Sequence, residues 1–150
     1  TKAELTSDAP FLFNADGTGG AEDGDRLPGS PENQFSMGVN YQTDVFNDKT
    51  LDINYGLTAQ SDVLSRVGLR DNGETLPGYS LSNISAKLTA DAWSTTLYVD
   101  NLFNKYAVTS VRRSDADITS ANGADIQRNY GHYINRPLTV GVKFNYKFEI

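Results

Sequence analysis

The chain has 150 residues, the length of one ordinary domain, and a formal net charge of −6. This acidic balance argues against a general nucleic-acid binder, which needs a basic face to release phosphate counterions. Because the sequence contains no Cys, it excludes disulfides, thiol catalysis and cysteine-based metal centres, while 13 Gly, 8 Tyr and 7 Phe favour β structure with many turns. No run of about 18 apolar residues occurs, so no transmembrane helix is predicted.

The chain opens with residues 1–6, which look like the end of a strand with Ala3 and Leu5 on one face. Residues 7–33 then hold too many Gly and Pro for regular structure and end in Leu27-Pro28-Gly29-Ser30-Pro31. Carboxylates in this segment offer oxygen ligands of the kind Ca²⁺ prefers, but their spacing departs from the EF-hand loop. We interpret the segment as a solvated loop, with a weak calcium candidate at Asp16, Glu22, Asp23 and Asp25.

Five later segments alternate apolar and polar residues with a period of two, which predicts antiparallel strands with one apolar face. They cover residues 34–43, 51–60, 81–90, 95–103 and 136–148. The last is the most regular, because every even position from Leu138 to Phe148 is apolar. The residues predicted to face lipid, if the sheet lies in a membrane, are Phe35, Val39, Ile53, Leu57, Leu88, Leu97, Val140, Val142 and Phe144.

The connections support pairing of these strands into an up-and-down meander. Residues 44–50 join two strands whose apolar positions are both odd, and residues 91–94 join an even strand to an odd one, so each turn has the parity that keeps the apolar faces together. The other connections, residues 7–33, 61–78 and 104–135, are long, and the last shows no lasting period. All short turns therefore fall at one end of the sheet and all long connections at the other.

This asymmetry, with strands of about 9 to 11 residues and aromatic residues near both strand ends, is typical of outer-membrane barrels. Such a barrel needs about eight strands at least, so five strands and part of a sixth would be a piece of something larger. Alternation alone also fits an ordinary core, and a soluble antiparallel β-sandwich that acts as a binding module remains the alternative. Inward polar residues, Asp52, Lys87, Asp100 and Lys143, are expected to form cross-strand pairs.

The long connections carry the candidates for ligand contact. Guanidinium groups suit carboxylates or phosphates, and aromatic faces suit sugars or flat chelates. Solvated loop residues and lipopolysaccharide contacts remain the other interpretation. The candidates are Phe11, Phe13, Arg66, Arg70, Arg112, Arg113, Arg128, Tyr130, His132 and Tyr133.

Catalysis finds little support in the sequence. His132 is the sole histidine, and no Gly-x-Ser-x-Gly elbow accompanies it, although a barrel enzyme that uses His132 is a third hypothesis. A lone His without Cys does not build a usual zinc site, and no nucleotide-binding glycine motif occurs. We therefore predict no enzyme, no metal centre and no cofactor.

Three segments resemble the closing strands of TonB-dependent outer-membrane receptors in their residue sequence, their order and their spacing. They are Leu76-Pro-Gly-Tyr-Ser-Leu81, Val99-Asp-Asn-Leu-Phe-Asn-Lys-Tyr106 and Arg136-Pro-Leu-Thr-Val-Gly-Val142, and Asp25-Arg-Leu-Pro-Gly-Ser-Pro31 is similar to a stretch that the family uses two hairpins earlier. The resemblance covers nearly the whole chain, and its most specific part is Asn101 to Tyr106. In the last strand, Thr139, Gly141, Phe144 and Tyr146 look like the insertion signal read by the barrel-assembly machinery, although Glu149-Ile150 follows the usual aromatic end.

The resemblance implies a barrel of about 22 strands with an N-terminal plug. Such a receptor would lie in the outer membrane of a Gram-negative bacterium, among lipid and lipopolysaccharide. It would take up a siderophore, cobalamin, a saccharide or a similar scarce nutrient with energy from the TonB complex. The chain would be the C-terminal part of the barrel, without the plug, the TonB-contacting region or the signal peptide.

Overall fold

The computed structural model describes residues 2–12, 19–46, 48–69, 73–113, 117–118, 126–127 and 130–148. Within these residues the chain is all-β apart from one short 3-10 turn, η1 (Val67–Leu69). No helix in this part of the chain is both long and apolar enough to span a bilayer. The chain divides into two compact units, which we call the loop unit (residues 1–34, 60–79 and 107–135) and the sheet unit (residues 35–59, 80–106 and 136–150).

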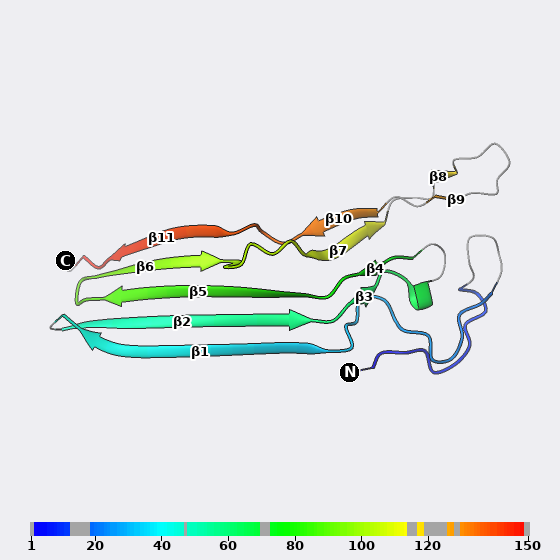
Figure 1. Cartoon of the computed structure of the whole chain (residues 1–150), viewed down its shortest axis with the longest axis horizontal. Coiled ribbons are helices and arrows are strands. Elements are labelled where there is room, and N and C mark those ends of the chain that lie inside the picture. Colours follow the sequence, from blue (N-terminus) through cyan, green and yellow to red (C-terminus); the bar gives the residue numbers. More distant parts are fainter. Residues whose placement is uncertain are drawn as a thin grey trace. The chain divides into compact units, whose positions relative to one another are not determined.

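The sheet unit is built on five neighbouring strands in the order β1-β2-β5-β6-β11, with β1 and β11 at the two edges (Figure 1). Their bounds are β1 (Gln34–Val45), β2 (Lys49–Gln60), β5 (Tyr79–Thr89), β6 (Trp93–Asp100) and β11 (Thr139–Tyr146). This arrangement confirms the predicted all-β antiparallel meander. The last strand is shorter than predicted, because Arg136 to Leu138 and Lys147 to Phe148 lie outside it.

The register keeps apolar residues together across the sheet. Leu97 of β6 lies opposite Ala86 of β5 and opposite Val142 of β11. The next row, Lys87, Thr96 and Lys143, is polar. Since directly opposite residues of an antiparallel pair project from the same face, β5, β6 and β11 share one apolar face and one polar face.

The same division into an apolar face and a polar face extends to β1 and β2. Asn40 Nδ2 of β1 donates a hydrogen bond to Asn54 Oδ1 of β2 over 2.6 Å, which places these two asparagines on a common face. Asn54 also lines a groove with Tyr98 and Lys143, so that common face is the polar one. The odd-numbered apolar residues of both strands therefore lie on the opposite face.

Both hairpin turns are tighter than predicted. In the β5–β6 turn, Thr89 pairs with Ser94, and Ala90 N donates to Trp93 O over 2.9 Å, so the tip is only Asp91-Ala92. In the β1–β2 turn, Phe46 and Asp48 have positive φ angles of 47° and 68°. Each turn still has the length parity that keeps the apolar faces together, because both strands of the hairpin extend into the turn that was predicted.

Two of the long connections contain strands that the sequence did not predict. β3 (Val63–Leu64) pairs with β4 (Thr75–Leu76), β7 (Val108–Arg113) pairs with β10 (Tyr130–Ile134), and β8 (Asp117–Ile118) pairs with β9 (Ile126–Gln127). The sequence shows no lasting period over residues 104–135, yet this connection contains two of the three strand pairs. A register shift between Tyr133 and Ile134 interrupts the period in β10, which explains why the pattern was missed.

The predicted strand end at residues 1–6 is also wrong. Glu4 forms only an isolated bridge with Arg26, while Leu5 N donates to Asp25 O and Leu27 N donates to Ala3 O. Residues 3–5 therefore pair with the loop segment 24–27 and not with the sheet. Within the described residues the sheet has five strands, and residues 3–5 add no part of a sixth.

Among the described residues, all buried apolar side chains belong to the loop unit, namely Ala9, Ala21, Val63, Leu64, Leu76 and Ala107. The buried residues of the sheet unit are instead polar, Ser82 and Asn101. The sheet unit therefore has no apolar core of its own.

Candidate functional site

The apolar face of the sheet is widely exposed. Six of its residues keep 49 to 65% of their surface accessible: Phe35, Val39, Leu97, Val140, Val142 and Phe144. Ile53, Leu57 and Leu88 on the inner strands β2 and β5 are half-buried. All nine positions predicted to contact lipid thus lie on this one face. A contiguous exposed apolar surface is the mark of a contact with another apolar phase or partner.

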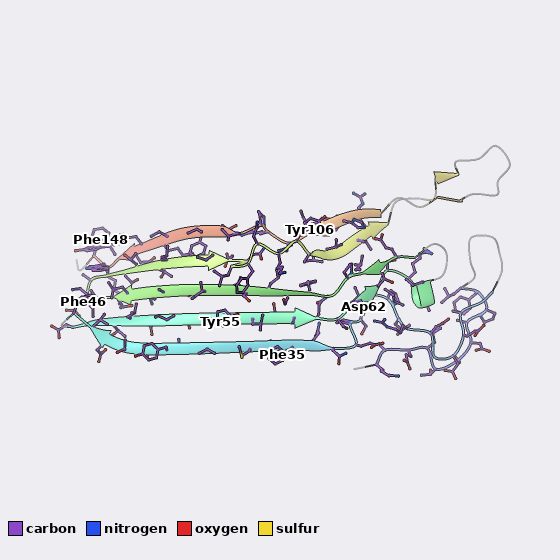
Figure 2. The ribbon with its side chains drawn as sticks, in the orientation of Figure 1. Phe35, Phe46, Tyr55, Asp62, Tyr106 and Phe148 are labelled. Carbon is purple, nitrogen blue, oxygen red and sulfur yellow. The ribbon has the colours of Figure 1, made fainter. Side chains whose placement is uncertain are left out.

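Aromatic residues gather at the end of the sheet that carries the two short turns. Trp93 and Phe144 stack with ring centroids 6.3 Å apart, and Tyr146 meets Phe148 edge-on at 4.9 Å. Figure 2 shows Phe148 and Phe46 at this end of the sheet. Aromatic rings in such a row suit the boundary between hydrocarbon and water.

The polar face holds a groove of about 410 Å³ that Asn54, Asn83, Tyr98, Asp100, Arg136 and Lys143 help to line. Lys143 Nζ lies 5.0 Å from the centroid of the Tyr98 ring, a cation–π contact. Among the described residues no ion pair joins Asp52, Lys87, Asp100 or Lys143. The register explains this, since Lys143 lies opposite Thr96 and Asp100 lies opposite Thr139.

The four residues that resemble an insertion signal lie in β11, and each makes a contact there. Thr139 Oγ1 donates to Pro137 O over 3.0 Å, Phe144 stacks on Trp93, and Tyr146 meets Phe148. Gly141 lies under the ring of Tyr98, which occupies the space of the missing side chain. These contacts are compatible with a role in assembly and also give each residue a structural role in the folded sheet.

Asn101, in the most specific family segment, is a structural clamp. It is 4% exposed, has a φ of 51°, and donates from Nδ2 to Lys105 O and Arg136 O, both over 2.9 Å. Its Oδ1 accepts from Lys105 N over 2.9 Å. Asn tolerates the left-handed region better than other residues with a side chain. Asn101 thus links the end of β6 to Arg136, in the segment that leads into β11.

In the loop unit, Arg26 joins its own segment to the segment that holds Asp62. Its guanidinium contacts Asp62 Oδ2 at 3.0 Å and Glu32 Oε1 at 3.3 Å, and Nη2 donates to Asp62 O over 3.1 Å. The Arg26 side chain is only 24% exposed, which makes these contacts more significant than a fully solvated pair. The Arg26–Pro31 segment is therefore fixed in place by its first residue.

His132 contacts a carboxylate and not another ligand candidate. Its Nε2 lies 2.7 Å from Glu74 Oε1, and Glu74 N donates to Ser65 Oγ over 2.7 Å. The contact links β10 to the segment that leads into β4. Since Ser65 Oγ faces the backbone amide of Glu74, these residues do not form a nucleophile–base pair.

The remaining ligand candidates are spread over the loop unit. Phe11 and Tyr133 are 73% and 55% exposed, Arg66 is half-buried and Arg112 is exposed. Phe13, Arg70 and Arg128 lie outside the described residues, as do the side chains of Arg113 and Tyr130. The structure thus shows no cluster that unites these candidates within the part of the chain it describes.

Backbone amides of the candidate calcium segment donate to nearby carboxylates. Asp25 Oδ2 accepts from Glu22 N over 2.9 Å, and Asp23 N donates to Asp8 Oδ1 over 3.0 Å. Asp16 lies outside the described residues. Among the described residues, no three His, Asp or Glu side chains are placed to hold a metal ion.

Sequence reasoning missed a cavity in the loop unit, also of about 410 Å³. Its walls come from four separated segments, residues 28–34, 60–65, 76 and 109–111. Pro28, Gly29 and Pro31 of its lining belong to the family-like segment Asp25 to Pro31. A cavity this size can hold a small molecule.

Comparison with known protein families gives one match, to the TonB dependent receptor-like β-barrel domain, over residues 3–102. The match covers 100 of the 150 residues and stops before β11, so it does not extend over nearly the whole chain as the resemblance did. No curated protein and no solved structure matches the chain. The match decides against the soluble sandwich and against the His132 enzyme. The chain belongs to the TonB-dependent receptors, as part of the outer-membrane β-barrel of a Gram-negative transport protein.

Proposed function

We propose that the chain is the C-terminal part of the barrel in a receptor that takes up a scarce nutrient with energy from the TonB complex. In this proposal β11 is the last strand of the barrel, and the plug and the TonB-contacting region belong to a longer protein. Its open edge would pair with the first barrel strand, since an unpaired strand edge is not tolerated in hydrocarbon.

The observation that carries the proposal is the sorting of the two sheet faces. One face exposes Val140, Val142 and Phe144, while the other holds Lys143 over Tyr98 in a polar groove. A soluble sheet buries its apolar face on a second layer, whereas a membrane barrel turns it to lipid and keeps polar residues inside. We assign the apolar face to lipid and the polar face to the lumen.

The loop unit would then supply part of the extracellular surface that meets nutrient and lipopolysaccharide. Its strands pair and its loops are tied by Arg26 and by the His132–Glu74 contact. Arg66, Arg112, Phe11 and Tyr133 remain proposed contacts with an external ligand or with lipopolysaccharide, because their side chains reach the surface in whole or in part.

Growth of a deletion strain tests the uptake function. The whole receptor is restored to the strain, and growth is measured with limiting iron, with limiting cobalamin, and with oligosaccharides as sole carbon source. We expect one condition to require both the receptor and an intact TonB complex. Growth that is independent of the receptor in all three conditions would reject the proposal.

A further inference from the structure

Two short hairpins of the loop unit are joined by an ionisable pair of side chains. The first hairpin is β3 with β4, and the second is β7 with β10 (Figure 1). His132 belongs to β10, and its Nε2 lies 2.7 Å from Oε1 of Glu74, the residue that precedes β4. The contact thus spans from one hairpin to the other, and both side chains keep access to water, at 41% and 30% exposed.

Each member of the pair is held in place by its own hairpin. Ser65 N donates to Glu74 O over 2.9 Å, and Glu74 N donates to Ser65 Oγ over 2.7 Å, so the backbone of Glu74 is fixed beside the end of β3. His132 lies opposite Val111 in the β7–β10 ladder. Because neither side chain is carried by a free loop, separation of the two hairpins breaks the contact between His132 and Glu74.

The same two hairpins contribute walls to the loop-unit cavity. Residues 63–64 and 76 come from the first hairpin, and residues 109–111 come from the second. His132 and Val111 are partners in the ladder, so their side chains project from the same face of the second hairpin. A change in the distance between the hairpins therefore changes the shape of the cavity.

The charge of the pair depends on pH through the imidazole. An imidazole gains a proton as the pH falls from about 8 to about 5, while a glutamate carboxylate stays ionised over most of this range. A neutral ring donates an ordinary hydrogen bond to a carboxylate, whereas a protonated ring donates a stronger, charge-assisted one. The joined state of the hairpins is therefore favoured as the pH falls, until the carboxylate itself is protonated.

The other charged or titratable groups that flank the pair on the two hairpins are arginines and tyrosines: Arg66, Arg112, Arg113, Tyr130 and Tyr133. By register, Arg113 and Tyr130 share the strand face of His132, and their side chains lie outside the described residues. Arginine side chains stay charged and tyrosine side chains stay neutral between about pH 5 and 8, so such groups change the strength of the contact without producing a pH response in this range.

We propose that His132 and Glu74 form a pH-sensitive latch, which holds the two hairpins together more firmly in mildly acidic than in mildly alkaline conditions. The latch is a property of the loop unit and does not depend on which nutrient the receptor takes up. Because both side chains are partly solvated, protonation changes the opening of the latch by about two- to fivefold.

Hydrogen exchange of the whole receptor in detergent tests the latch, at about pH 5.5 and about pH 8.5. Peptides that cover β7 and β10 report the opening of the second hairpin, and peptides that cover β5 and β6 are the internal reference. At each pH the exchange rate of a variant is divided by that of the wild type, which cancels the pH dependence of the exchange chemistry. Heat-dependent gel mobility confirms that each variant is folded.

Two variants remove the change of charge and keep the ability to form a hydrogen bond. His132→Gln retains a donor, and Glu74→Gln retains an acceptor. We expect the rate ratio of each variant to rise about two- to fivefold from the alkaline to the acidic condition, because only the wild type gains the charged pair. Glu4→Gln is the matched control, since it removes a loop-unit carboxylate that contacts Lys2, and its ratio should be the same at both pH values.

The outcomes separate the latch from other sources of pH dependence. A rate ratio for His132→Gln that is equal at both pH values would overturn the latch. A ratio that changes with pH in His132→Gln and not in Glu74→Gln would show that the histidine acts through another group, and this result would also overturn it. A change of the same size in Glu4→Gln would assign the response to the overall charge of the loop unit. The growth test of nutrient uptake is independent of all three results.

Discussion

Tyr98 of β6 lies directly across Gly141 of β11, and its ring fills the space that a Gly141 side chain would occupy. Lys143 then covers the same ring from two residues further along β11. Glycine in a strand often marks such a close approach. The residue that the sequence offered as part of an assembly signal thus also has a packing reason to be glycine.

Gly141→Ala should therefore impair folding through Tyr98. The added methyl group overlaps the ring and must displace it, at a cost of about 1–3 kcal/mol. Tyr98→Ala should relieve the defect in the double variant. Heat-dependent gel mobility of the whole receptor measures the folded fraction. If the double variant is no better than Gly141→Ala alone, Gly141 acts through recognition by the assembly machinery and not through packing.

Asn101→Asp tests the clamp between β6 and β11 with minimal change of shape. The substitution keeps the acceptor for Lys105 N and removes the two bonds to Lys105 O and Arg136 O. Buried groups left without a partner cost about 1–3 kcal/mol. We expect a lower midpoint of thermal unfolding, while Asn145→Asp on the exposed part of β11 should be neutral. Equal midpoints for the two variants would contradict a clamp.

The sheet was largely predictable because alternation is a local property. The even positions Leu138 to Phe148 show which residues of the last strand share a face without any knowledge of its partners. The odd or even number of residues in each turn then predicted which faces of neighbouring strands lie on the same side of the sheet. The exact turn tips were not predicted, since the strands extend beyond the last clear alternating residue at both hairpins.

The loop unit was poorly predictable because its contacts join distant residues. His132 and Glu74 are 58 positions apart, and the cavity draws on four separate segments. Even Tyr98 and Gly141 meet only through the β6–β11 register, which no short turn fixes. Sequence reasoning favoured Arg and aromatic residues as binding groups, and it did not point to Gln34, Gln60 or Val63, which are among the described residues that line this cavity.

The assignment of the two faces predicts opposite outcomes for one substitution at two places in β11. Val140→Arg puts a charge on the proposed lipid face and should cost about 2–4 kcal/mol near the bilayer midplane. Asn145→Arg puts the same side chain on the polar face and should be tolerated, as should Lys143→Ala. The amount of folded receptor in purified outer membranes is the measurement. Similar losses for Val140→Arg and Asn145→Arg would show that the faces are assigned wrongly.

His132→Ala and Glu74→Ala should have the same effect, because each removes the 2.7 Å contact that braces the β7–β10 hairpin. Both side chains are partly exposed, at 41% and 30%, so the effect on global stability should be small. Local opening of the hairpin should instead increase, which limited proteolysis of the whole receptor detects as faster cleavage within residues 107–135. The double variant should be no worse than either single one, since residues that act through one shared contact are not additive. Additive increases in cleavage would show that His132 and Glu74 act separately, and an unchanged rate in both single variants would show that the contact does not brace the hairpin.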